Sequence, residues 1–175
     1  MKKKFVMAVA AVAMAAVMSV SAFAADGVTV ASITGNDGTT FVTPSSASAS
    51  EETKKAYEAI ATTKGTTEEK LAAALVSTST EGSAEQAAAI LNDAATVVGA
   101  ETVADVTIRT VGDVVVENNT ATLSVAGVKD DEAVVVVYLD ENGNWQTMVV
   151  IARNGQLVFR LPKSTTVMVL TKKAA

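Results

Sequence analysis

Two short acidic runs are the residues of this chain best suited to chemistry. They are Asp130-Asp131-Glu132 and Asp140-Glu141, and a glycoside hydrolase needs only two carboxylates about 5 to 10 Å apart. The chain has no histidine and no cysteine, which excludes Ser-His-Asp and Cys-His catalysis as well as imidazole and thiolate metal sites. Both runs fall in predicted turns, where carboxylates are usually solvated. We therefore expect no catalytic residue and no cofactor, and keep a carboxylate-based glycoside hydrolase only as an alternative.

The second acidic run begins like a calcium-binding loop. Asp140, Asn142 and Asn144 alternate as in an EF-hand, but Trp145 stands where that loop needs glycine and Ile151 where it needs a bidentate glutamate. An Asn-Gly turn between two strands explains the same residues. The sequence thus predicts a turn and no metal site.

The single tryptophan is the remaining candidate for contact with a ligand. Trp145 follows the polar turn directly, so its ring could be an exposed stacking platform for a sugar or a peptide, with Asn142 and Asn144 beside it. The other interpretation places the ring in the core at one end of a sheet. Apolar residues occupy both alternation sets of this strand, so periodicity does not decide between the two placements of the ring. We favour the core, because a lone tryptophan beside a turn more often covers one end of a sandwich core.

Near its end the chain imitates a signal for covalent attachment to a cell wall. The sequence Leu161-Pro162-Lys163-Ser164-Thr165 resembles the sortase pentapeptide and precedes an apolar run and two lysines. The apolar run is only VMVL, whereas a membrane span needs about 20 residues. We predict instead that Pro162 ends one strand and that 166–171 is the closing strand.

The start of the chain has the pattern of a secretory signal. Lys2, Lys3 and Lys4 precede an Ala/Val/Met run, and Ala22-Phe23-Ala24 supplies small residues for cleavage. An uncleaved anchor helix is the alternative. Without those lysines, 11 basic residues remain against 19 acidic ones, a formal charge of −8. This charge disfavours nucleic acids and anionic membrane surfaces as partners.

Two compositional regimes divide the rest of the chain near Gly99. The first, rich in Ala, Glu, Lys and Gln, has three helix starts in which a hydroxyl residue precedes Glu or Gln by three: Ser48 with Glu51, Thr66 with Glu69, and Ser83 with Gln86. Narrow apolar stripes then predict which side chains pack: Tyr57, Ile60, Ala61, Leu71, Ala74, Leu75, Ala87, Ile90, Leu91 and Ala94. Such thin stripes need a partner, so we expect the helices to lean on each other and on the second regime.

The second regime is rich in valine and threonine with frequent turn signals. Seven strands are predicted in it: 104–109, 114–116, 120–125, 134–138, 145–151, 156–161 and 166–172. Before the helices, VTVASIT and TTFVT flank Gly-Asn-Asp-Gly and predict a short hairpin. The fold class is therefore α+β: a short N-terminal hairpin, about three Ala-rich helices, then a seven-strand antiparallel β-sandwich.

The stretch from Val116 to Leu170 supports a resemblance. Its order of a hydrophobic strand, a Gly-containing turn, one Trp, a second Gly turn and a Ser-containing final strand resembles the C-terminal β-sandwich of small exported or surface proteins of Gram-positive Firmicutes. That group often has Ser-Pro before its last strand, where this chain has Thr165-Thr166. The resemblance implies a module for display or interaction and brings no catalytic residues.

These observations give one expected organisation and two main expectations for function. Residues 1–24 form a signal peptide, 25–47 the hairpin and a linker, 48–99 a helical segment and 100–175 a β-sandwich domain. We expect a secreted, extracellular, non-catalytic module that binds a protein or glycan of the cell envelope, with no stable membrane anchor after cleavage. The alternative is a structural or self-assembling subunit, a homo-oligomer that pairs through a strand such as 166–171 or through the Ala faces of its helices.

Overall fold

The computed structural model describes residues 31–32, 39–116 and 118–174. The predicted signal peptide and most of the predicted N-terminal hairpin lie outside these ranges. Within them the order of elements is β1 (Ala31–Ser32), β2 (Thr40–Val42), α2 (Glu51–Thr62), α3 (Thr67–Thr78), α4 (Ala84–Val97), a 3₁₀ turn (Val103–Asp105), β3 (Val106–Val115), β4 (Thr120–Val125), β5 (Ala133–Leu139), β6 (Trp145–Ile151), β7 (Gln156–Arg160) and β8 (Thr165–Lys172). The predicted α+β class is confirmed.

Side-chain caps define where the three helices begin. Thr66 and Glu69 form the predicted capping box of α3. At the start of α4, the Ser83 hydroxyl accepts a hydrogen bond from the backbone N–H of Gln86. The start of α2 differs from the prediction, because Ser50 and not Ser48 is its N-cap. At the other end of α4, Gly99 has a φ of 64° and Ala100 N–H donates to the Ala95 carbonyl at 2.9 Å. This glycine-dependent geometry closes the helical segment.

The strands form two antiparallel sheets. One has five strands in the order β2-β3-β8-β5-β6, and the other has three in the order β1-β4-β7. The predicted N-terminal hairpin is wrong in its pairing, because β1 pairs with β4 and β2 pairs with β3. Likewise β8 is not a terminal edge of its sheet but its centre, between β3 and β5. A closing strand in the sequence is thus a central strand in space, as the antiparallel pairing permits.

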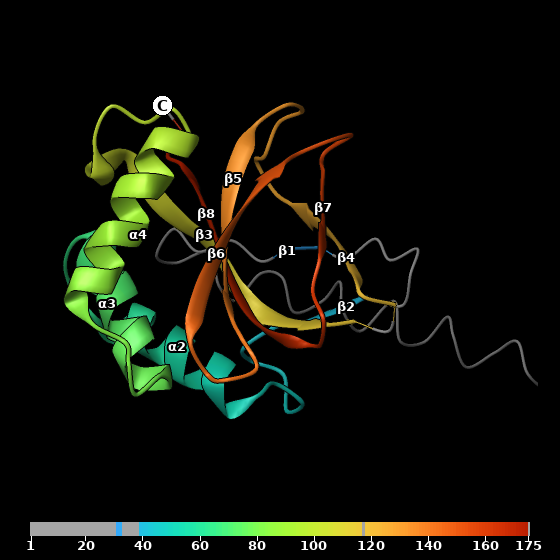
Figure 1. Cartoon of the computed structure of the whole chain (residues 1–175), viewed down its shortest axis with the longest axis horizontal. Coiled ribbons are helices and arrows are strands. Elements are labelled where there is room, and N and C mark those ends of the chain that lie inside the picture. The colour runs from blue at the N-terminus through green and yellow to red at the C-terminus, as the bar shows by residue number, and fades with distance from the viewer. Residues whose placement is uncertain (1–30, 33–38, 117, 175) are drawn as a thin grey trace, which may run out of the picture.

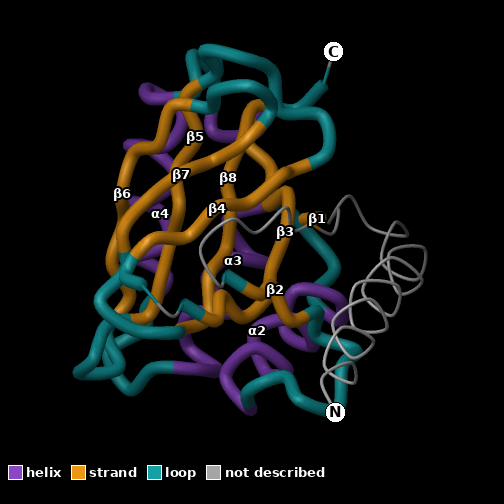
Figure 2. The backbone as a smooth tube through the Cα atoms, turned by 90° about the vertical axis from the view of Figure 1, so that its right-hand side faces the viewer, coloured by secondary structure: helices purple, strands orange, loops and turns teal. Residues whose placement is uncertain are grey.

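The molecule has three layers, and each interface between layers is an apolar core. Helices α2, α3 and α4 cover one face of the five-stranded sheet (Figure 1), and the three-stranded sheet covers the other (Figure 2). The helix-side core joins predicted stripe residues such as Leu71, Leu91 and Ile60 to Ile108 and Leu170 of the sheet. Ala61, predicted in the stripe of α2, is exposed, since the buried residues of that helix are Thr53, Ala56 and Ile60.

A bulge in β3 explains why two predicted strands are one. The strand runs unbroken over ten residues, but its register against β8 shifts between Ile108 and Thr110. One extra residue reverses the alternation of side chains along a strand. Ile108 before the bulge and Val111 after it therefore both reach the helix-side core. The sequence predicted a gap between 109 and 114, and the structure carries one strand across it.

The same bulge directs a carboxylate toward the start of α2. Asp113 is 8% exposed and accepts hydrogen bonds from Ser50 N at 2.6 Å, Ser50 Oγ at 2.7 Å and Thr53 Oγ1 at 2.6 Å. Thr166 of β8 donates a longer one, at 3.3 Å. A negative charge at a helix N-terminus is also favoured by the helix dipole. Asp113 thus fixes α2 on the sheet and accounts for the helix beginning at Glu51.

Candidate functional site

The turn between β5 and β6 uses its polar groups to hold its own backbone. Asp140 Oδ1 accepts hydrogen bonds from Asn142 N at 2.8 Å and from Asn144 N at 2.9 Å, and Oδ2 accepts from Gln146 Nε2 at 3.2 Å. The hydrogen bond from Asn144 is the main cause that lowers the pKa of Asp140, and Lys163 adds an attractive charge. The arrangement is the predicted Asn-Gly turn, with the carboxylate directed at backbone amides.

The ring of Trp145 lies in the helix-side core. It is 4% exposed, and its indole Nε1 donates to Thr78 Oγ1 at 2.9 Å. An exposed stacking platform is therefore not formed by this residue, because its ring faces are covered by the helices. Asn142 is exposed and Asn144 is half-buried in the turn. The structure does not bring the three predicted ligand-binding residues together on one surface.

The two acidic runs lie at opposite ends of β5. Asp130 to Glu132 precede this seven-residue strand, and Asp140 follows it. A strand of this length spans roughly 20 Å, about twice the largest separation that an acid pair in a glycoside hydrolase uses. Asp130 is instead bound to Gly155 N at 2.7 Å. Within the described ranges no three acidic residues gather as metal ligands would.

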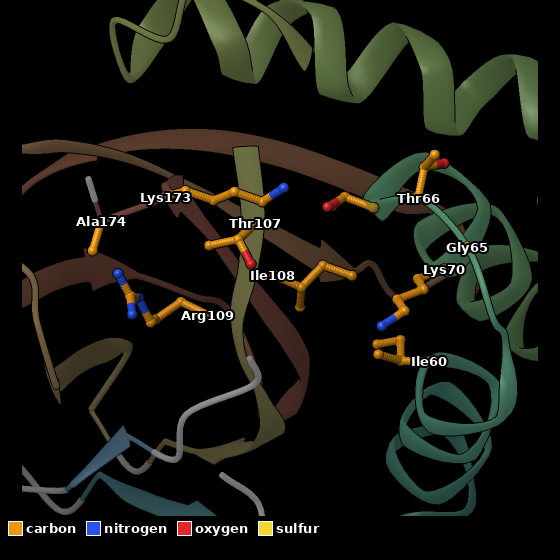
Figure 3. Close-up of a pocket in the computed structure, with 10 residues that line it drawn as sticks. Ile60, Gly65, Thr66, Lys70, Thr107, Ile108, Arg109, Lys173 and Ala174 are labelled. Carbon is orange, nitrogen blue, oxygen red and sulfur yellow. The ribbon is translucent and has the colours of Figure 1, made fainter. Parts of the chain in front are cut away.

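A pocket lined by basic side chains lies between β3 and the start of α3. Its volume is about 410 Å³, within the range of small-molecule sites. Three elements supply its cations: Lys70 from α3, Arg109 from β3, and Lys173, which follows β8. Thr66 and Thr107 add hydroxyl groups. Figure 3 shows Lys173 above Thr107 and Lys70 beside Ile60, with the Ile108 side chain between the two ammonium groups in this view, whereas Arg109 extends toward Ala174.

The pocket is basic although the chain is acidic. No Asp or Glu belongs to the described residues that line it, while the chain carries a formal charge of −5. The Glu69 carboxylate lies beside the pocket, where its Oε2 accepts a hydrogen bond from N of the lining residue Thr66 at 2.7 Å and caps α3. A local concentration of positive charge in a concave surface attracts anions even on an acidic protein. The pocket is therefore the strongest candidate for a functional site.

The three cations of this pocket are far apart in the sequence and form no motif there. Lys70, Arg109 and Lys173 are separated by 39 and 64 positions along the chain, and their juxtaposition depends on β8 pairing with β3 and on α3 packing beside it. In the sequence, Lys173 belongs to the pair of lysines that resembles the end of a sorting signal. No local pattern could have joined the three.

A second, more apolar hollow lies between α4 and the edge strand β6. It encloses about 390 Å³ and is lined by Ile90 and Val97 of α4, Val135 of β5 and Val149 of β6, with Asp93 as its acidic residue. Val149 is 57% exposed and Ile151 is 43% exposed. In the described part of the chain, β6 pairs with β5 alone.

Comparison with protein-family models, with curated proteins and with solved structures yields no significant match for this chain.

Proposed function

We propose that the protein is an exported, non-catalytic module that binds a component of the cell envelope. The basic pocket between β3 and α3 is the observation that carries this proposal, because it concentrates three cations on a chain of net negative charge. The resemblance of residues Val116 to Leu170 to exported Gram-positive proteins supports the same role. The partner is a protein or glycan of the envelope.

Export is the part of the proposal that depends on the start of the chain. The residues with the signal pattern, up to Ala24, lie outside the described ranges. Among the helices that the structure describes, none has the length and apolarity of a membrane span. Expression of the full chain in a Gram-positive host, followed by fractionation and mass determination of the mature N-terminus, tests export. Recovery of the uncleaved chain from the cytoplasm would contradict it.

Binding to the envelope is tested by co-sedimentation with purified cell-wall fragments. We expect the protein to sediment with the fragments and to be released by salt, because the pocket acts through charge. A useful control is an acidic protein of similar size that has no basic pocket. If the protein remains in the supernatant at low salt, the envelope is not its partner.

A second candidate function is self-assembly, and the exposed edge of β6 favours it. Strand β6 has no charged residue, proline or glycine, the features that usually protect an edge strand from pairing. Two acidic copies can approach through this neutral edge with little repulsion, and the exposed Val149 and Ile151 would then lose contact with water. The sites suggested by sequence are less suitable, since strand 166–171 is central and Ala74, Ala87 and Ala94 are buried.

Self-assembly is tested by the molar mass in solution over a range of concentrations. If copies pair through β6, Val149→Lys should shift the protein toward the monomer. Val76→Lys is the matched control, because Val76 is equally exposed, at 57%, but lies on α3. A wild-type protein that is monomeric at every concentration would exclude this candidate.

A further inference from the structure

The basic pocket contains hydrogen-bond donors that have no acceptor within the described residues. Lys70 is half-buried, yet its ammonium group forms no hydrogen bond and no ion pair there. Thr107 is also half-buried, and its hydroxyl is likewise unused. Water reaches both groups, so neither needs a partner within the protein and both are open to a ligand. The pocket therefore offers donors to an acceptor that comes from outside.

The second lysine is held in place across the pocket. Lys173 Nζ donates to the Ala104 carbonyl, and Lys173 N–H donates to the Asp105 carbonyl at 2.7 Å. An ammonium group has three donors, so Lys173 keeps others for a ligand while its position is fixed. Arg109 is positioned in a similar way, since its Nε donates to Thr171 Oγ1 at 3.3 Å. Fixing the cations in advance reduces the entropy lost when a ligand binds.

We propose that this pocket binds a phosphate group, with Lys70 and Lys173 as its two main contacts and Thr107 as a hydroxyl donor. Lysine binds phosphate as a point charge, and both lysines line the same pocket. The volume, about 410 Å³, admits a phosphate together with an attached sugar. The net charge of −5 disfavours a long polyanion, whose other phosphates would face the acidic surface.

The assignment rests on the proposed function as a binding module and names the chemistry that its site recognises. The phosphate group can belong to an envelope glycan or to a free small molecule. Both sources present the same anionic oxygens to Lys70 and Lys173, so the probes must separate them.

Titration of the purified protein, followed by NMR of its backbone amides, tests the assignment. The probes are inorganic phosphate, glucose 1-phosphate and citrate at constant ionic strength. We expect both phosphate compounds to shift the amides of Lys70, Thr107 and Lys173. Tighter binding of glucose 1-phosphate would indicate a sugar phosphate, and equal binding a free phosphate. Citrate binding as tightly as the phosphates would overturn the assignment.

Paired variants identify the contacts. Lys70→Gln with Lys173→Gln should raise the dissociation constant of glucose 1-phosphate about tenfold or more, because two charge-assisted hydrogen bonds are lost. Lys55→Gln with Lys163→Gln removes the same charge from exposed positions that do not line the pocket, since Lys163 precedes β8 and Lys173 follows it. This pair should change the dissociation constant less than about twofold. Equal weakening by both pairs would show that net charge alone attracts the anion, and would overturn the assignment.

The same variants separate this assignment from the proposed function. If the protein sediments with cell-wall fragments and the Lys70 and Lys173 variant does so equally well, the module binds the envelope elsewhere. The phosphate site is then wrong only if the phosphate compounds also fail to shift the amides of Lys70, Thr107 and Lys173. If the purified protein binds glucose 1-phosphate through these lysines but stays in the supernatant of cell-wall fragments, the phosphate site stands and the envelope function fails.

Discussion

Asp113 of β3 accepts two hydrogen bonds from Ser50, one from its backbone N–H at 2.6 Å and one from its hydroxyl at 2.7 Å. The two residues are 63 positions apart, and Ser50 is at the same time the N-cap of α2. The contact therefore decides where the helix begins and how it is oriented on the sheet. It is a structural role for a buried carboxylate, since each of its oxygens receives at least one donor.

Replacing this carboxylate should be one of the more destabilising single changes in the chain. In Asp113→Asn the side-chain NH₂ group, itself a donor, would replace an oxygen that accepts hydrogen bonds from Ser50 or Thr53. We therefore expect the free energy of unfolding to fall by about 2 to 4 kcal/mol. Urea denaturation measures the change. Glu58→Gln, at an exposed position of α2, is the control and should be within about 0.5 kcal/mol of wild type. Equal stabilities for the two variants would mean that Asp113 does not hold the helix.

The single tryptophan should report a buried environment. Trp145 is 4% exposed, so we expect blue-shifted emission and weak quenching by acrylamide in the native protein. Urea should shift the emission to the red and make quenching strong, which provides the internal control. Red-shifted, readily quenched emission in the native state would contradict the placement of this ring between helices and sheet.

The hydrogen bond from Trp145 to Thr78 can be tested separately from the burial of the ring. Thr78→Val keeps the shape of the side chain but leaves the indole N–H without its acceptor, which should cost about 1 to 3 kcal/mol of stability. Thr80→Val, at an exposed position just beyond α3, should change stability little. The Thr78 hydroxyl also donates to the Ala74 carbonyl at 2.7 Å, so the difference between the two variants in urea denaturation measures the contribution of both hydrogen bonds of this hydroxyl.

The lowered pKa of Asp140 predicts that the stability of the protein depends on pH in the acid range. The hydrogen bonds from Asn144 and Asn142 lower the pKa of Asp140 below its ordinary value of 3.8. A group with a lowered folded pKa stabilises the protein above its unfolded pKa, and this contribution is lost as pH falls through the folded pKa. Thermal melts from about pH 7 to about pH 2 should therefore show the advantage of wild type over Asp140→Asn shrinking in acid. A constant difference over this range would contradict the lowered pKa.

Local chemistry in the sequence predicted much of the secondary structure. The capping box of Thr66 and Glu69 lies where it was expected, because both partners belong to one turn of helix. Ser50 was missed as an N-cap because its defining partner, Asp113, lies on a distant strand. Strand β3 was predicted as two strands for a related reason. Its pairing with β8, which is distant in the sequence, continues on both sides of the bulge.

The candidate site was predicted less well than the fold. The sequence directed attention to Trp145, Asn142 and Asn144 because they are adjacent and chemically distinctive. The structure instead brings Lys70 and Lys173 to one pocket through long-range pairing. Residues that act together only after folding leave no local pattern, so the arrangement of elements must be known first.

The close approach of β2 to the sheet gives a final prediction. A Cβ atom built on Gly112 would lie 2.2 Å from Phe41 Cζ, so the buried Phe41 ring of β2 packs directly on this glycine. Gly112→Ala should therefore destabilise the protein by about 1 to 3 kcal/mol through overpacking. In the background of Phe41→Leu, which makes the side chain smaller, the same change should cost at least about 1 kcal/mol less, because the two residues are in contact. If Gly112→Ala lowers the free energy of unfolding equally in both backgrounds, the ring of Phe41 does not lie against Gly112 and β2 packs differently on β3.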